Sequence, residues 1–411
     1  MLSRRAVIIQ APAAALAGTY AARAFAADKT VTIGMSLSLT GADAQSAQKV
    51  RDGAMMAIDE ANAKGGVAGY KITPLVLDDG TATAGQYDPA QAATNARKLV
   101  SQADVVAAIG PQMSGSGKAM SAILSQGNLA TVSPMSTNPD ITDPKFAAQY
   151  RPKGKAIYFR TVTTDAYQGP NMANFYADTL KAKSVFVLDD SGAFGVGISN
   201  SFEAQAKKRG LKVAGRDQLN PKETDYTTIL TKIKALNPDS IYYGGVAQAG
   251  VKLAKQAHDI VPKMIKGGGD GLASADFLSG TGFPAVEGWY ITIAAPHMLD
   301  EPQVKDWIER YQKKYGSAPE DYSITAYDAA LVILDAIKRV AAAGKAVNRD
   351  TVRDAIQETK LMTLQGEVSF DANGDITNRV VSVFQVRKNA AKPLDDLGSQ
   401  LKYIGVAPQS A

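Results

Sequence analysis

Short runs of β-branched and apolar residues alternate with longer amphipathic segments along most of this chain. The short runs predict strands, at 31–36, 72–77, 105–109, 130–133, 184–188, 211–214, 240–243 and 289–294. The segments between them carry apolar residues at helical spacing, at 48–62, 91–100, 117–125, 172–180, 198–208, 227–235 and 249–257. Regular alternation of this kind is typical of βαβ units. The sequence therefore predicts an α/β fold with parallel sheets.

The first 26 residues have the pattern of an export signal. Arg4 and Arg5 precede an alanine-rich apolar run, and Ala24-Phe25-Ala26 provides the small-x-small pattern of a signal-peptidase site. We expect a signal peptide over residues 1–26, by the twin-arginine route or the ordinary secretory route, and a periplasmic protein. Cleavage removes three arginines and no acid, which lowers the formal net charge from +5 to +2. A nearly neutral chain gives nucleic-acid binding little support.

The chain has no cysteine, so burial of apolar surface and not disulfides must stabilise the exported protein. The 385 residues that remain of the 411 after loss of the first 26 exceed the ~250–300 at which one core usually divides. Two lobes are expected. The alternation stops in the polar stretch 147–160 and again after residue 294, and we place crossings between the lobes there.

These breaks assign residues 27–160 and 295–365 to a first lobe, and residues 161–294 and 366–411 to a second lobe. Three crossings would leave a hinge of several strands. Near the C-terminus, the predicted strands 367–370 and 379–386 flank a turn at 371–375, which predicts a hairpin-like end.

Polar residues follow two neighbouring strands of the first lobe. Strand 105–109 is followed by a loop at 110–117 that contains Ser114 and Ser116, and strand 130–133 by a loop at 133–140 that contains Ser136 and Thr137. The carboxyl ends of adjacent parallel strands are where open α/β sheets bind ligands, and helix N-termini attract anions. For Ser116 a helix cap is the better interpretation, whereas Ser114 with Thr137 predicts a carboxylate site if the loops lie side by side.

Several segments, in order, resemble the periplasmic branched-chain amino-acid-binding proteins. They are Val31-Thr32-Ile33-Gly34, Leu39-Thr40-Gly41, Gly53-Ala54, Lys64-Gly65-Gly66-Val67, Asp78-Asp79, Ile109-Gly110 with Ser114, Ser133-Pro134 through Pro139, Asp190 to Gly197, Tyr242-Tyr243-Gly244-Gly245 and Asp270-Gly271. The resemblance covers essentially the whole mature chain. It implies a type I periplasmic binding protein, with two Rossmann-like lobes of parallel sheet joined by a three-crossover hinge.

The resemblance also implies roles for individual residues. Ser114 and Thr137 would hold a ligand carboxylate, the carbonyl of Met135 would accept from an α-ammonium, and Ser136 would line the same loop. Asp270 would neutralise the ammonium, because a charge left unpaired in a closed cleft is costly. Local sequence alone makes a turn residue an equally good interpretation of Asp270.

Four further positions fall where the family lines its pocket with aromatic side chains. Phe194 replaces a tyrosine, Val246 and Ser46 replace larger aromatic residues, and Tyr322 keeps an aromatic ring. Ser46 and Val246 leave extra volume, so the identity of the ligand stays open.

Nothing in the sequence predicts catalysis. Without cysteine thiol chemistry is excluded, neither His258 nor His297 has metal-ligand spacing, and the glycines of 192–197 do not match a dinucleotide loop. We expect no enzyme, no cofactor and no metal, but a monomeric carrier that closes on a small carboxylate-bearing solute and delivers it to an inner-membrane ABC permease. A branched-chain or related α-amino acid is the first expectation. A non-amino-acid carboxylate or amide, such as an aromatic acid held without Asp270, and a ligand-sensing receptor component remain alternatives.

Overall fold

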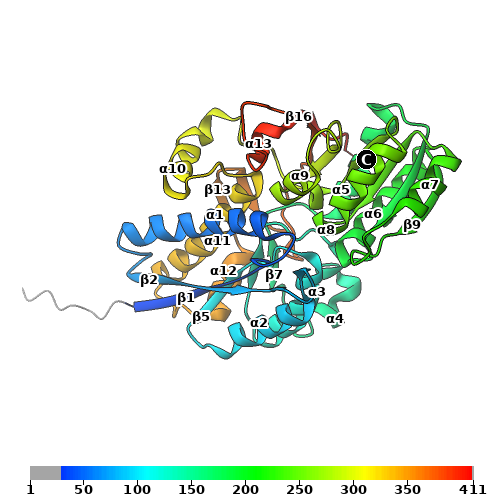
Figure 1. Ribbon diagram of the computed structural model, residues 1–411. Helices are drawn as coiled ribbons and strands as arrows, with labels where there is room; N and C mark the ends of the chain where they lie inside the picture. The colour runs from blue at the N-terminus through cyan, green and yellow to red at the C-terminus, as the bar shows by residue number, and fades with distance from the viewer. Residues whose placement is uncertain (1–28, 410–411) are drawn as a thin grey trace, which may run out of the picture.

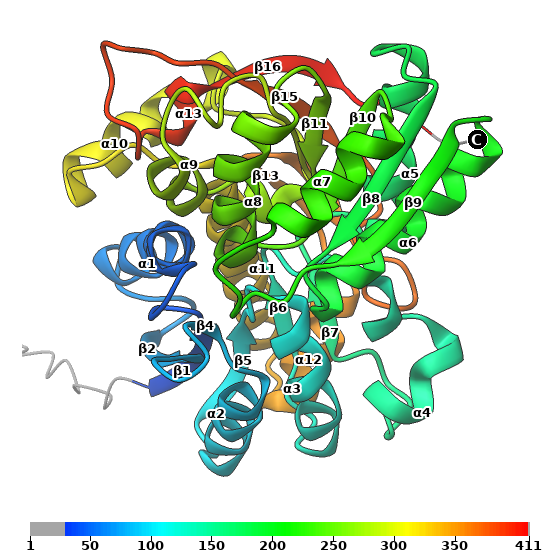
Figure 2. The ribbon, with the colours of Figure 1, turned by 45° about the vertical axis from the view of Figure 1, so that its right-hand side comes forward.

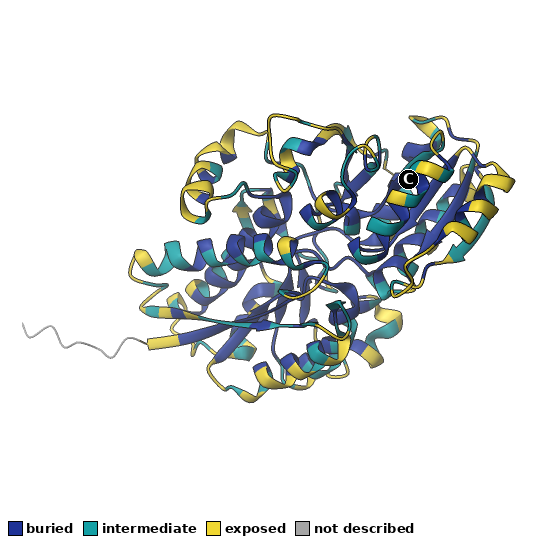
Figure 3. Ribbon diagram, in the orientation of Figure 1, coloured by how far each residue is buried: buried dark blue, intermediate teal, exposed yellow. Residues whose placement is uncertain are grey.

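A computed structural model describes residues 29–409, and the predicted signal peptide lies outside them. Figure 1 shows two lobes, each built around its own sheet, with helices packed on both faces. The inner strands of both sheets are buried, while most edge strands are partly exposed and the outward faces of the helices are exposed (Figure 3). Strands covered on both sides have little polar surface, which explains why runs such as 105–109 are apolar throughout.

Among the described residues, the first lobe contains a five-stranded parallel sheet in the order β2-β1-β5-β6-β7. Its strands are β1 (Lys29–Leu37), β2 (Tyr70–Asp78), β5 (Val105–Ile109), β6 (Thr131–Ser133) and β7 (Tyr158–Arg160). One face is covered by α1 (Ala44–Ala63) and α11 (Asp321–Ala342), the other by α2 (Pro89–Ser101) and α3 (Ser114–Gln126) (Figures 1 and 2). Smaller elements complete this lobe: β3 (Gly80–Thr81), β4 (Gln86–Tyr87), α4 (Ala147–Tyr150), α10 (Lys305–Tyr315) and α12 (Arg349–Gln357).

The second lobe contains a seven-stranded sheet, counted over residues 29–409, in the order β16-β15-β12-β11-β10-β8-β9. Its strands are β8 (Ser184–Asp189), β9 (Lys212–Gln218), β10 (Ser240–Gly244), β11 (Ile265–Gly268), β12 (Tyr290–Ile293), β15 (Ser382–Val386) and β16 (Leu401–Val406). The strands from β12 to β9 pair in parallel, whereas β15 pairs antiparallel with both of its neighbours, β12 and β16. On one face lie α5 (Asp165–Asp178) and α6 (Ala193–Lys208), and on the other α7 (Thr227–Leu236), α8 (Ala247–Ile260) and α9 (Ala275–Thr281) (Figure 2). The short α13 (Leu397–Gln400) precedes β16.

The chain crosses between the lobes three times. The crossings connect β7 to α5, β12 to α10, and the β13 (Lys360–Thr363) and β14 (Gly366–Ser369) pair to β15. They are hydrogen-bonded to each other, since the amide of Thr163 donates to the carbonyl of Ala294 at 2.8 Å and that of Arg160 to the carbonyl of Gly374 at 3.3 Å. The predicted α/β fold with a three-crossover hinge is therefore confirmed.

The predicted C-terminal hairpin is confirmed only at its turn, where Phe370 forms an antiparallel bridge with Ile376, and the two predicted strands do not pair with each other. Strand β14 pairs with β13, whereas β15 lies between β12 and β16 in the second sheet. The turn at 371–375 is part of the third crossing, and the β13–β14 pair spans the predicted lobe boundary at residues 365 and 366. Two adjacent extended segments predict a hairpin locally, but the edge of the second sheet offers β15 more buried surface than a local partner does.

Strand β11 did not stand out in the sequence, because its Gly267 and Gly268 are typical of a turn. Here a side chain has no room: a Cβ at Gly267 would lie 2.6 Å from the Tyr176 hydroxyl, and one at Gly268 2.5 Å from the carbonyl oxygen of Tyr243. Of the described helices, none is both long enough and apolar enough to cross a membrane.

Candidate functional site

Helix α3 begins at Ser114, four residues before the start implied by a loop over 110–117. The glycines that suggested a loop are there for packing: a Cβ at Gly115 would lie 2.6 Å from the ring of Tyr87, and one at Gly117 would lie 2.6 Å from the Tyr158 hydroxyl. Ser114 therefore stands in the first helical turn, where backbone N–H groups have no partner within the helix. This position suits an anion better than a loop would.

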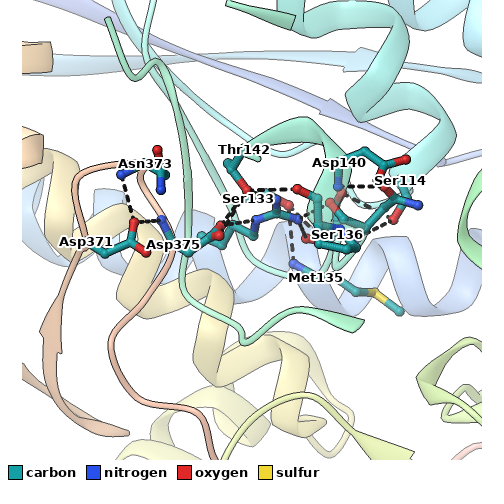
Figure 4. Close-up of polar contacts among 12 residues, drawn as sticks. Ser114, Ser133, Met135, Ser136, Asp140, Thr142, Asp371, Asn373 and Asp375 are labelled. Atoms are coloured by element: carbon teal, nitrogen blue, oxygen red, sulfur yellow. Dashed lines mark hydrogen bonds and ion pairs between the residues drawn. The ribbon is translucent and has the colours of Figure 1, made fainter. Parts of the chain in front are cut away.

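The two strand-end loops lie side by side, as predicted. β5 and β6 are neighbours, and Ser133 joins their loops because its hydroxyl donates to the carbonyl of Pro111 at 2.7 Å and accepts from the amide of Ser136 at 3.0 Å. The hydroxyl of Ser114 accepts from the amide of Asn138 at 3.1 Å. Figure 4 shows Ser114 and Ser136 pointing toward one another.

A buried arginine holds the second of these loops against the hinge. Arg160 is fully buried, and its guanidinium donates to the carbonyls of Ser136 and Asn138 at 3.0 and 2.8 Å. The same group pairs with Asp375 at 2.8 Å in the third crossing. Arg160 also donates to the hydroxyl of Thr142, which in turn donates to Asp375 at 3.0 Å; Ser136, Thr142 and Asp375 are labelled in Figure 4. The loop after β6 and the hinge are thus joined by one side chain.

Asp270 faces these loops from the second lobe, directly after β11. The residue is 2% exposed, and its carboxylate accepts from Gln168 Nε2 at 3.1 Å and from the Tyr322 hydroxyl at 2.5 Å. Gln168 also donates to Asp165 at 3.1 Å, so two buried aspartates share one amide. Burial raises the pKa of both carboxyls, and for Asp165 the charge of Asp270 adds to the effect. Such a pair attracts a cation.

Six of the predicted residues line one small cavity between the lobes. Ser114, Met135 and Thr137 come from the first lobe and Phe194, Val246 and Asp270 from the second; Gln112, Met113 and Gly271 complete the wall. The cavity offers about 20 Å³ to a water-sized sphere. That is roughly the room that one water needs, so a solute with the heavy atoms of an amino acid enters only if side chains or lobes move apart.

The other three predicted residues lie behind this wall. The Ser136 hydroxyl is 3.5 Å from that of Ser114, and Tyr322 reaches the cavity through Asp270. Ser46 is 1% exposed, with its hydroxyl 3.4 Å from Gln112 Nε2. In this arrangement they support residues of the cavity wall.

Sequence reasoning missed Gln112, Asp165 and Gln168. Asp165 and Gln168 stand one helical turn apart at the start of α5, directly after the first crossing. Their i, i+3 spacing was a usable signal, since it puts two polar side chains on one helix face. No local signal marked Gln112.

The lobes also touch around the cavity. Asn138 Nδ2 donates to the carbonyl of Ala193 at 2.8 Å, and Gln248 Nε2 to that of Ala84 at 3.2 Å. Gly197 makes the first contact possible, since a Cβ there would lie 2.6 Å from Asn138 Nδ2. Gly192 allows a similar approach, since a Cβ there would lie 3.0 Å from the Tyr87 hydroxyl of the first lobe.

Within residues 29–409, no three His, Asp or Glu side chains gather in a way that would hold a metal ion. His297 contacts Asp321 at 2.9 Å through Nδ1 and Asp300 at 3.1 Å through Nε2. These contacts lie where the second crossing meets α11, apart from the cavity.

Two α/β lobes, a three-crossover hinge and a polar cavity between the lobes define a cleft-type solute-binding protein. The model of the periplasmic binding protein family matches residues 30–391. The Leu/Ile/Val-binding protein BraC3 of Rhizobium johnstonii is 30% identical over 356 residues, which cover 86% of this chain and 91% of that protein. The chain therefore belongs to the periplasmic branched-chain amino-acid-binding family, as its sequence motifs implied.

Two further proteins are similar to this chain over nearly its full length. The leucine-, isoleucine-, valine-, threonine- and alanine-binding protein of Pseudomonas aeruginosa is 29% identical over 380 residues, which cover 92% of this chain and 95% of that protein. The crystal structure of the leucine-binding protein LivK from Thermotoga maritima superposes with a TM-score of 0.78 at 27% identity, covering 92% of this chain and 98% of that one.

Proposed function

We propose that this protein is the periplasmic solute-binding component of an ABC importer and that it captures an α-amino acid by lobe closure. One observation carries the proposal: anion-binding groups of the first lobe and a buried carboxylate of the second lobe face the same cavity. An α-amino acid has both charges, so it can bridge the lobes. It acts as a monomer, performs no catalysis and presents its closed form to an inner-membrane permease.

Each end of the solute has a defined partner. The carboxylate lies at the start of α3, with Ser114 and Thr137 as donors, and the ammonium lies against Asp270 and the carbonyl of Met135. Because the two partners belong to different lobes, the solute binds the closed form more tightly than the open one. That difference in affinity is what shifts the hinge. Phe194 and Val246 cover the solute from the second lobe.

A thermal-shift screen of residues 27–411 tests this function. The ligands are the common L-amino acids, aromatic carboxylic acids and short amides. At a concentration of 100 Kd, a bound ligand adds about 2.7 kcal/mol to the free energy of unfolding. We expect an α-amino acid to raise the melting temperature. If only an aromatic acid or a short amide raised it, the amino-acid assignment would be wrong.

Thr137→Ala gives the matched test of the carboxylate site. It should abolish the shift, whereas Thr94→Ala, at an exposed threonine of α2 in the same lobe, should leave it unchanged. Equal shifts in both variants would contradict the role of Thr137. Small-angle scattering with and without ligand then tests closure, which should reduce the radius of gyration.

A further inference from the structure

Gln112 has an unusual environment at the edge of the cavity. It is 1% exposed and lines the cavity wall, yet its Oε1 has no hydrogen-bond partner. Its Nε2 is held 3.4 Å from the Ser46 hydroxyl. A buried acceptor without a donor costs about 1–3 kcal/mol, so a donor from the solute would remove a real penalty.

A second unpartnered acceptor stands at the start of α1, the helix that carries Ser46. Asp43 caps α1 one helical turn before Ser46; it is 3% exposed, and its Oδ2 has no partner. Burial, together with the charges of Asp276, Asp190 and Asp79, raises the pKa of Asp43 to about 8. Asp276 closes this end of the cleft, because its carboxylate accepts from the amide of Ser46 at 3.2 Å. This end of the cleft is therefore rich in buried acidic groups, and the ionised form of Asp43 is disfavoured unless a cation lies beside it.

Asp190 contributes from the second lobe. Its carboxylate accepts from the amide of Val246, a residue of the cavity wall, at 2.9 Å. It also lines an outer interlobe pocket of about 430 Å³, together with Tyr87. Asp190 thus contacts the wall of the small cavity and also lines a roomier pocket. Among the described residues, no Lys or Arg forms an ion pair with Asp43, Asp79, Asp190 or Asp276.

We infer that the solute carries a positively charged nitrogen at its distal end, and that this group donates hydrogen bonds to Gln112 and Asp43. The inference rests on the proposed function, in which Ser114, Thr137 and Asp270 hold the α-carboxylate and α-ammonium. The distal cation satisfies both unpartnered acceptors, and its charge favours the ionised form of the buried acids around it. An aliphatic side chain would leave both acceptors unpartnered beside it. The ligand class is therefore a basic α-amino acid.

Isothermal titration calorimetry of residues 27–411 tests this inference with four probes of similar length. L-Norleucine has an apolar end, L-glutamine a neutral amide, and L-ornithine and L-lysine a cation. We expect one of the two cationic probes to bind at least tenfold more tightly than L-glutamine and L-norleucine. If L-norleucine or L-glutamine bound as tightly as both cationic probes, the inference would be overturned.

Two variants assign the effect to this end of the cleft. Gln112→Leu and Asp43→Asn should each weaken the cationic probe at least tenfold and leave L-norleucine within threefold. Asp52→Asn, at a buried aspartate two turns further along α1, is the matched control and should change neither. The Asp43 variant replaces a buried acid by an amide of the same shape, and a melting curve of each variant verifies folding. An unchanged cationic preference in both folded variants would contradict the assignment.

The inference and the proposed function fail in different ways. If L-norleucine or L-leucine binds and the cationic probes do not, the distal assignment is wrong and the α-amino-acid site stands. If none of the common L-amino acids of the thermal-shift screen binds at millimolar concentration, the proposed function itself is wrong.

Discussion

Asp270→Asn separates the binding role of this side chain from its effect on stability. The substitution keeps the size of the residue and removes its charge. In the folded protein Asp270 is buried beside Asp165, and burial raises the pKa of both. The ligand-free protein thus contains two acidic groups that burial makes hard to ionise. Replacing one of them by a neutral amide removes this unfavourable interaction. We expect the melting temperature of the ligand-free variant at pH 7 to be unchanged or higher.

Ligand binding should respond in the opposite direction. The ammonium loses a charge-assisted hydrogen bond in a buried site. The Asn side chain also brings an NH2 donor to a position where Gln168 and the Tyr322 hydroxyl donate to the carboxylate in the wild type, so two donors then face each other. Loss of one partner in a buried charged pair costs about 2–4 kcal/mol. The expected result is Kd weaker by about 30- to 700-fold.

Calorimetric titration at pH 7 with the L-amino acid that binds most tightly measures this change. Asp328→Asn is the matched control, because Asp328 is also fully buried and accepts from Thr363 and from the amides of Leu364 and Gln365, away from the cavity. It should lower stability and leave Kd within about threefold. A Kd for Asp270→Asn within threefold of the wild type would refute the ammonium assignment.

Three further predictions concern the hinge and the closed form. Arg160→Ala should lower the free energy of unfolding by about 2–4 kcal/mol in urea denaturation, because it leaves two buried loop carbonyls without this donor and removes the ion pair with the partly exposed carboxylate of Asp375. A loss below 1 kcal/mol would contradict its role in joining loop and hinge. Burial alone lowers the pKa of His297, but its contacts with Asp321 and Asp300 raise it above the usual 6.5. The resulting stabilisation is complete below about pH 6 and is lost as pH rises through the higher folded pKa. The difference in free energy of unfolding between wild type and His297→Gln should therefore shrink between pH 6 and 8. A difference that stays constant over this range would contradict the raised pKa. Asn138→Ala removes the hydrogen bond to the Ala193 carbonyl, which stabilises only the closed form, by about 1 kcal/mol. Calorimetric titration should therefore show ligand binding about fivefold weaker. Unchanged affinity would mean that the open form has this hydrogen bond as well.

Much of the fold could be predicted from local pattern. Strand 105–109 coincides with β5, because a strand covered on both faces needs an unbroken apolar run. The loops after β5 and β6 could be placed side by side, since adjacent parallel strands end at the same edge of a sheet. Errors arose where tertiary contacts reverse a local preference, as with the glycines of β11 and of α3, which are selected for close packing and not for turns.

The sequence by itself determined the alternation of strands and helices, hence two parallel-stranded lobes, and the polar loops at the carboxyl ends of β5 and β6. Those features depend on the order of apolar and polar residues over a few turns of chain. Only the tertiary structure decided that Asp165 and Asp270 share Gln168, and that Gln112 and Asp43 each keep a buried oxygen without a donor. The acceptors in each set are far apart in the sequence, and hinge and sheet geometry bring them together. Whether a buried acceptor finds a donor depends on that geometry, which no local pattern contains.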